Sequence, residues 1–116
     1  MATFTESELS GSTSGKPVPV VATATLGTTL HTAGASGYDK VWLWASNVTA
    51  IAATLTIEWG GATDPGEHMV KAFSIPPNSL PIPIASGQII RDSLLVTAFS
   101  GTASAINVSG YVIAVR

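Results

Sequence analysis

The stretch that decides the fold is Lys40-Val-Trp-Leu-Trp-Ala-Ser-Asn-Val-Thr-Ala-Ile-Ala-Ala-Thr-Leu-Thr-Ile-Glu-Trp59, which contains all three tryptophans of the 116-residue chain. In its second half apolar and polar residues alternate, with the apolar side chains at Ala53, Leu55, Ile57 and Trp59. A period of two is typical of a β-strand with one buried face. The stretch therefore predicts two strands joined as a hairpin.

The first half of this stretch is apolar on both faces. Val41, Leu43 and Ala45 share one face of the predicted strand, whereas Trp42 and Trp44 share the other. A strand of this kind needs a cover on each side, and a two-sheet sandwich offers a strand only one core face. We expect one set to lie in the core. For the other set, a contact with another subunit or with the N-terminal segment is favoured over a ligand platform.

The rest of the chain consists of short apolar runs separated by turn signals. Residues 60–67 contain Gly-Gly and Asp-Pro-Gly, and residues 76–84 hold four prolines, which exclude a helix and a central strand. Gly110 interrupts the last run and predicts a β-bulge. Seven or eight short strands without helical periodicity predict an all-β fold. We expect a single antiparallel β-sandwich or jelly-roll-like barrel over residues 17–116.

Residues 1–16 are rich in Ser, Thr and Gly and predict a flexible N-terminal arm. Besides Met1, its sizeable apolar residues are Phe4 and Leu9. If the arm is ordered, we expect these two side chains to lie on another surface, either of the same chain or of a neighbour. The alternative is a disordered tail.

Charged residues make up only 10% of the chain, and the net charge is −2. A soluble domain ordinarily has about a quarter, so the low charge indicates a surface that is largely covered in an assembly. The five basic residues are scattered, which argues against nucleic-acid binding.

Two stretches without charge, residues 41–57 and 93–115, contain too many Ser, Thr and Asn for a bilayer span, so we expect no membrane partner. The acidic start lacks the features of a secretory signal and predicts synthesis in the cytoplasm. The absence of cysteine excludes disulfides and thiolate metal sites.

The residues that could carry chemistry are few. Asp64, Glu67 and His68 could offer metal ligands, but a solvated turn explains them and the spacing of a calcium loop is missing. A catalytic triad would need His31 or His68, the two histidines, and no Gly-x-Ser-x-Gly motif accompanies them.

Paired carboxylates for glycoside hydrolysis could come from Glu58, Asp39 or Asp92. Glu58 lies on the polar face of a predicted strand, where a solvent-facing role explains it. Asn47-Val-Thr and Asn107-Val-Ser match the glycosylation pattern, but chance explains such matches in a chain rich in Ser and Thr. We expect no enzyme, no cofactor and no metal.

Four segments carry a family resemblance: Val41-Trp-Leu-Trp-Ala-Ser-Asn47, Leu55-Thr-Ile-Glu-Trp-Gly-Gly61, Asp64-Pro-Gly66 and Gly110-Tyr-Val-Ile-Ala-Val115. Over residues 40–116 the chain resembles small virion proteins of tailed bacteriophages, of the capsid decoration or cement type. The shared features are strand and turn patterns and include no catalytic signature.

This resemblance implies a non-enzymatic structural protein on the capsid surface of the virion. Such proteins are compact β-domains, commonly trimers, that clamp neighbouring major capsid subunits. The expected partners are therefore further copies of the chain, with a homotrimer favoured, and the major capsid protein. No functional residue can be transferred from the family. The predicted interface residues, Phe4, Leu9, Trp42 and Trp44, rest on the sequence pattern alone.

Two other classes stay open. The first is a phage tail or fibre component that uses the same kind of sandwich. The second is a carbohydrate-binding module, which would need Trp42 and Trp44, or Trp59 and Tyr38, as a flat, exposed stacking surface beside polar groups.

Overall fold

The computed structural model describes residues 2–116, and within this range it contains nine strands and no helix. One group of strands consists of β1 (Phe4–Glu8), β2 (Val18–Pro19), β4 (Tyr38–Asn47), β7 (Ile82–Ile90) and β9 (Ile106–Val115). The other group consists of β3 (Thr28–Thr32), β5 (Ala53–Trp59), β6 (His68–Ile75) and β8 (Leu95–Ser100).

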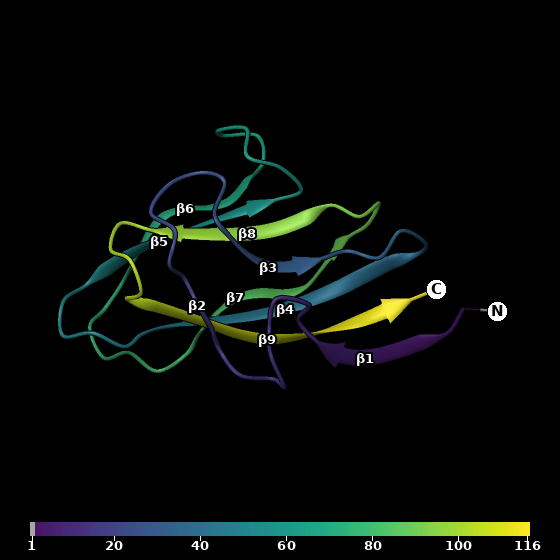
Figure 1. The fold of residues 1–116 in the computed structure, drawn as a ribbon, viewed down its shortest axis with the longest axis horizontal. Helices are drawn as coiled ribbons and strands as arrows, with labels where there is room; N and C mark the ends of the chain where they lie inside the picture. The colour runs from purple at the N-terminus through teal and green to yellow at the C-terminus, as the bar shows by residue number, and fades with distance from the viewer. Residues whose placement is uncertain (1) are drawn as a thin grey trace.

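These strands form two sheets packed face to face (Figure 1). Sheet A has the order β1-β9-β4-β7, with β2 also paired to β9, and sheet B has the order β3-β8-β5-β6. All the pairings are antiparallel. The predicted β-sandwich is confirmed.

Strand β4 separates its two sets of apolar side chains between the core and the outer surface. Val41, Leu43 and Ala45 point between the sheets and are fully buried. Trp42 and Trp44 lie on the outer face of sheet A and are half-buried. Among residues 2–116 the fully buried apolar side chains are all aliphatic. Trp42 and Trp44 are therefore outside the core, whereas Trp59 packs against it partly buried.

The predicted hairpin between β4 and β5 is wrong, because these consecutive strands belong to different sheets. The loop of residues 48–52 crosses from sheet A to sheet B. Buried Asn47 organises this crossing, since its amide donates to the carbonyls of Ile51 at 2.8 Å and Ile75 at 3.1 Å and its oxygen accepts from Thr49. A strand-to-strand turn and a sheet-to-sheet crossing leave the same alternation in the sequence, so the pattern alone did not separate them.

The predicted bulge at Gly110 is also wrong. The ladder between β4 and β9 runs without interruption from Tyr38 opposite Val115 to Asn47 opposite Ile106. Glycine is needed here because a Cβ at this position would collide with the backbone of Trp42 on β4. Since the register does not slip, Tyr111 and Ile113 share the face of Trp42 and stay on the outer surface of sheet A.

Part of the predicted N-terminal arm belongs to the sandwich in this structure. Strand β1 pairs with β9 at the edge of sheet A, from Phe4 opposite Val115 to Glu8 opposite Tyr111. The five side chains of β1 are exposed, whereas Leu9, directly after it, is fully buried in the core. The segment therefore lies on its own chain, and residue 1 is outside the described range.

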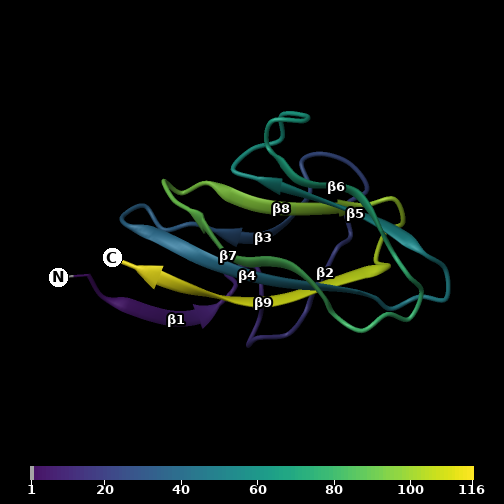
Figure 2. The ribbon, with the colours of Figure 1, turned by 180° about the vertical axis from the view of Figure 1, so that it is seen from behind.

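The two ends of the elongated sandwich differ. Both termini lie at one end, and the loops β4–β5, β6–β7 and β8–β9 lie at the other (Figures 1 and 2). Backbone hydrogen bonds join these loops, from Asn78 N to Thr49 O at 2.9 Å and from Val48 N to Ala105 O at 2.9 Å. We call the loops of residues 48–52 and 76–81 the apolar tip, because Val48, Ile51 and Leu80 are 54%, 78% and 84% exposed there.

Replacing Gly110 with Ala should lower the free energy of unfolding by about 1–3 kcal/mol, the range for forcing an extra carbon into a packed site. Gly66→Ala is the matched control, because a Cβ there meets nothing within 4 Å, and it should change stability by no more than about 0.5 kcal/mol. Urea unfolding measures both. Equal stabilities of the two variants would contradict the close approach of β4 and β9.

Candidate functional site

A row of aromatic side chains lies on the outer face of sheet A. Trp42 and Tyr111 are direct partners in the β4–β9 ladder, and their rings stack with centroids 4.9 Å apart and planes 8° apart. Trp44 stacks on the same tyrosine, at 6.1 Å and 24°. We define the aromatic face as this outer surface of sheet A, formed by Lys40, Trp42, Trp44, Ile89, Tyr111 and Ile113.

The aromatic rings use their flat faces within the chain. Trp42 lies on the central strand β4, with Tyr111 on β9 to one side and Gly87 on β7 to the other. A Cβ at Gly87 would come within 3.1 Å of the Trp42 ring, and its φ of +82° suits glycine. Each tryptophan thus has a ring face packed on Tyr111, which differs from a flat, open sugar-stacking platform.

The structure does not bring the four predicted interface residues together into one surface. Trp42 and Trp44 are on the aromatic face, and Phe4, which is 65% exposed, lies on the same outer side of sheet A at the edge strand β1. Leu9 is a core residue of its own chain and offers no surface to a partner. The pattern missed Tyr111 and Ile113, because the change of parity at Gly110 suggested a slip that would return them to the core.

Glu58 is fully buried on the outer side of sheet B, which corrects the expected solvent-facing role. Its carboxylate accepts hydrogen bonds from the Thr25 hydroxyl, from Gly27 N at 2.8 Å and from Thr97 Oγ1 at 2.7 Å. Burial raises the pKa of Glu58, but these hydrogen bonds and nearby His68 outweigh it and hold the pKa below its usual value. The covering loop comes from residues 23–27, far away in sequence.

His68 lies between two carboxylates. Its side chain is 7% exposed, with Nε2 3.9 Å from Glu58 Oε2 and Nδ1 3.6 Å from Asp64 Oδ1. Lys71 Nζ donates to both oxygens of Asp64 at 2.8 Å, and this hydrogen bond lowers the pKa of Asp64. Glu67 turns elsewhere and accepts from Thr63 N at 2.9 Å. Within residues 2–116, no group of three or more His, Asp or Glu is arranged to hold a metal ion.

His31 and Asp39 form a second buried pair, with His31 Nε2 2.7 Å from Asp39 Oδ2. Burial raises the pKa of Asp39, but the hydrogen bond from His31 and the Arg116 guanidinium, 2.8 Å away, leave it below its usual value. Ser10 does not complete a triad, because its hydroxyl accepts from Thr32 N at 2.6 Å and its backbone N–H donates to His31. Nothing in this pair activates a nucleophile.

The three carboxylates considered as possible catalytic acid pairs do not come together. Glu58 and Asp39 belong to separate clusters with different partners. Asp92 is exposed and lies 3.6 Å from Arg91. The arrangement of an acid and a second carboxylate across a substrate is therefore not built from these residues.

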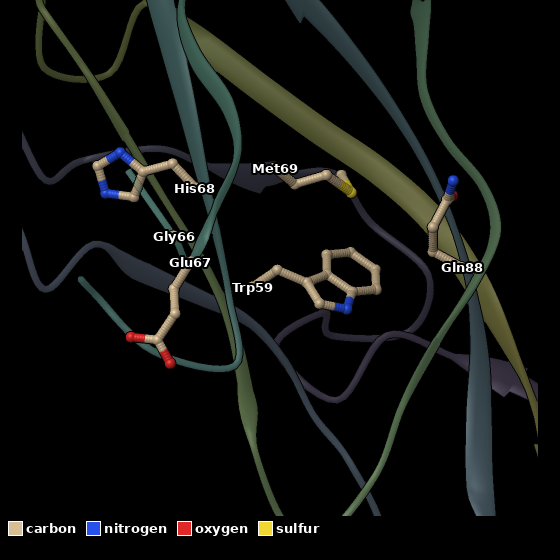
Figure 3. Close-up of a pocket in the computed structure, with 6 residues that line it drawn as sticks. All are labelled: Trp59, Gly66, Glu67, His68, Met69 and Gln88. Carbon is tan, nitrogen blue, oxygen red and sulfur yellow. The ribbon is translucent and has the colours of Figure 1, made fainter. Parts of the chain in front are cut away.

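A cavity of about 270 Å³ lies near the edge of the sandwich and is lined by Trp59, Gly66, Glu67, His68, Met69 and Gln88. Figure 3 shows Trp59, Met69 and Gln88 beside this space, whereas the side chains of His68 and Glu67 turn away from it. Trp59 Nε1 donates to the carbonyl of Ile89 at 3.2 Å. Trp59 lies on sheet B and Tyr38 on sheet A, so the structure does not join them as a stacking pair.

Comparisons with protein-family models, with characterised proteins and with solved structures each found no match. Within residues 2–116 there is no helix that is long and apolar enough to cross a membrane.

Replacing Glu58 with Gln should lower the free energy of unfolding at pH 7 by about 1–3 kcal/mol, the range for a hydrogen-bonded charged group. The folded-state pKa of Glu58 lies below its ordinary value, so its stabilisation is present above about pH 4.5 and is lost as the pH falls through the folded pKa. Urea unfolding at pH 7 and at pH 3 should show the difference between the two proteins shrinking with acidity.

Glu6→Gln on the exposed strand β1 is the control for Glu58→Gln, and it should change stability by no more than about 0.5 kcal/mol. A difference between wild type and Glu58→Gln that stays constant between the two pH values would show that the ionised carboxylate does not stabilise the fold.

Proposed function

We propose that this chain is a non-enzymatic structural protein of a tailed-bacteriophage virion, which decorates and stabilises the capsid through contacts between its own copies and with major capsid subunits. A homotrimer is the favoured assembly. The aromatic face is the observation that carries the proposal, and the resemblance of residues 40–116 to capsid decoration proteins supplies the class.

The composition of the aromatic face supports a protein contact. Large apolar patches on soluble proteins mark interaction sites, and Trp and Tyr are enriched at the energetic centres of interfaces. This face presents Trp42, Trp44 and Tyr111 with Ile89, which is 53% exposed. Its formal charges are Lys40 and, along the β1 edge, Glu6 and Glu8, which lie opposite Ile113 and Tyr111. A second copy of the chain could cover the aromatic rings while the two acids stay at the edge of the contact.

The apolar tip supports a second contact at another part of the molecule. No Asp, Glu, Lys or Arg occurs in residues 41–57 or 72–90, the stretches that contain its two loops. Hydrogen bonds of Asn47 and Ser79 hold these loops together, including Asn47 N to Ser79 Oγ at 3.0 Å. Because the loops are held in place, their uncharged aliphatic side chains are suited to packing into an apolar pocket on a partner protein such as a capsid subunit.

One observation argues against the carbohydrate-binding class, and capsid binding separates the tail or fibre class. A carbohydrate-binding module needs open ring faces, and the Trp42 ring is already occupied by Tyr111 and Gly87. A tail or fibre component would form the same trimer but would fail to bind capsids.

Light scattering should give the wild-type chain a mass of three times 11.8 kDa. The double variant Trp42→Thr/Trp44→Thr should be a folded monomer, because it removes the apolar centre of the aromatic face while keeping residues suited to a strand. Phe73→Thr/Leu94→Thr is the control, since these side chains are 44% and 43% exposed elsewhere, and it should stay trimeric. A monomeric wild type at all concentrations would overturn the proposed assembly.

Sedimentation with capsids of the phage that encodes the chain tests the second contact. Ile51→Ser/Leu80→Ser should leave the trimer intact and weaken capsid binding by about tenfold or more, because two exposed aliphatic side chains lose their burial at the contact. Leu26→Ser, at a side chain that is 54% exposed outside the apolar tip, should bind like wild type. A trimer whose wild-type form does not sediment with capsids would favour the tail or fibre class.

A further inference from the structure

The N-terminal segment, residues 2–11, is fastened to the sandwich through His31. The backbone N–H of Ser10 donates to His31 Nδ1 at 3.1 Å, and His31 Nε2 lies 2.7 Å from Asp39 Oδ2. Because a backbone N–H can only donate, Nδ1 is the acceptor and the ring hydrogen is on Nε2. The imidazole is therefore neutral in this arrangement, and it is 4% exposed.

Protonation of His31 would break this fastening on one side only. The added proton goes to Nδ1, where it faces the Ser10 N–H, so two donors meet and the acceptor is lost. On the other side, the imidazolium keeps its hydrogen bond to Asp39 and gains opposite charge. Protonation therefore removes the hydrogen bond from Ser10 to His31 and keeps the contact between His31 and Asp39.

The charged surroundings of His31 are simple. Asp39 on β4 contacts the ring directly, and Arg116, after β9, lies 2.8 Å from the other oxygen of Asp39. Strand β8, which pairs with β3 at His31 opposite Val96, has no titratable side chain. In the N-terminal segment, Glu8 is engaged by the backbone N–H of Gly15. The charge state of His31 thus acts on Asp39 and on Ser10.

Little else of the N-terminal segment is built into the core. All side chains of β1 are exposed, and Leu9 is the buried apolar residue of the segment. The remaining ties are the β1–β9 ladder, the two backbone hydrogen bonds between Thr3 and Arg116, the hydrogen bond from Gly11 N to Leu30 O at 2.9 Å and that from Thr32 N to Ser10 Oγ at 2.6 Å. Release of the segment would leave sheet B and strands β9, β4 and β7 of sheet A in place.

A released segment would uncover the edge of β9 at residues 111–115 and the site of Leu9. The structure itself shows which sequence fits this edge, because residues 4–8 already pair with it. A second copy of the chain carries the same residues, and exchange of an identical element between copies needs no new surface. Residues 12–17 provide the link, with Gly15 in open space at a φ of +77°.

We propose that residues 2–11 form an exchangeable strand, which a second copy of the chain accepts in place of its own, and that protonation of His31 opens it. The exchange needs only copies of this chain. It therefore goes beyond the capsid role and can succeed or fail independently of it.

Engineered cysteines test the exchange cleanly because the chain has none. Thr5 and Ala114 are partners across β1 and β9. Thr5→Cys chains are mixed with Ala114→Cys chains, held at about pH 5 to favour protonation, and returned to about pH 7.5 for oxidation. The disulfide between positions 5 and 114 of different chains, identified by mass spectrometry, should be about tenfold more abundant than in a mixture kept at about pH 7.5.

The double variant Thr5→Cys/Ala114→Cys shows that the pair can bond, since it should close within one chain at about pH 7.5. His31→Asn, introduced into both mixed chains, keeps an oxygen acceptor for Ser10 at either pH and should abolish the acid response. His68→Asn removes the other histidine and should keep the acid response. The proposal is overturned if the mixed chains form no interchain bond although the double variant closes, or if His31→Asn responds like wild type.

Amide hydrogen exchange on the wild-type chain tests the opening without any substitution at His31. After correction for intrinsic rates, protection at Ser10 should fall about tenfold or more between pH 7.5 and pH 5, while protection at Leu43 in the core is retained. Equal protection of Ser10 at the two pH values would overturn the role of His31.

Discussion

The unbroken ladder between β4 and β9 is the constraint on which the rest of the structure depends. It runs through ten residue pairs, from Tyr38–Val115 to Asn47–Ile106. Because side chains alternate across a sheet, a shift of one residue would move every side chain of a strand to the opposite face. This register places Val41 and Leu43 in the core and stacks Trp42 on Tyr111 outside it. The core and the aromatic face are therefore two results of a single pairing.

The few charges of the chain act as anchors for segments that cover the sheets. Glu58 holds the loop of residues 23–27 against sheet B, and Asp39 with His31 holds the N-terminal segment. A buried carboxylate is tolerated only where hydrogen bonds replace water, so each of these acids accepts a single arrangement of its covering segment. In a chain with 10% charged residues, two of the acids thus fix the position of the segments that cover them.

The sequence predicted what local alternation can determine, and it failed where distant segments decide. The period of two identified strands, and two sheets followed because apolar faces need a cover. The alternation within residues 40–59 could not separate a hairpin from a crossing between sheets, since both need the same pattern. Glu58 looked solvent-facing because its cover comes from residues 23–27. At Gly110 the change of parity suggested a slip, whereas outward apolar side chains produce the same pattern without one.

The aromatic face and the apolar tip are separate surfaces, which supports the proposed structural role. The aromatic face lies along the broad outer side of sheet A, and the apolar tip lies at the end opposite the termini (Figure 1). A copy seated on the broad side leaves the tip open, because the tip loops extend beyond the strands of the sheet. The chain could thus contact its own copies and a different protein at the same time. Simultaneous contacts gain affinity through effective concentration without new surface, which in the proposed role would let an 11.8 kDa domain hold neighbouring subunits together.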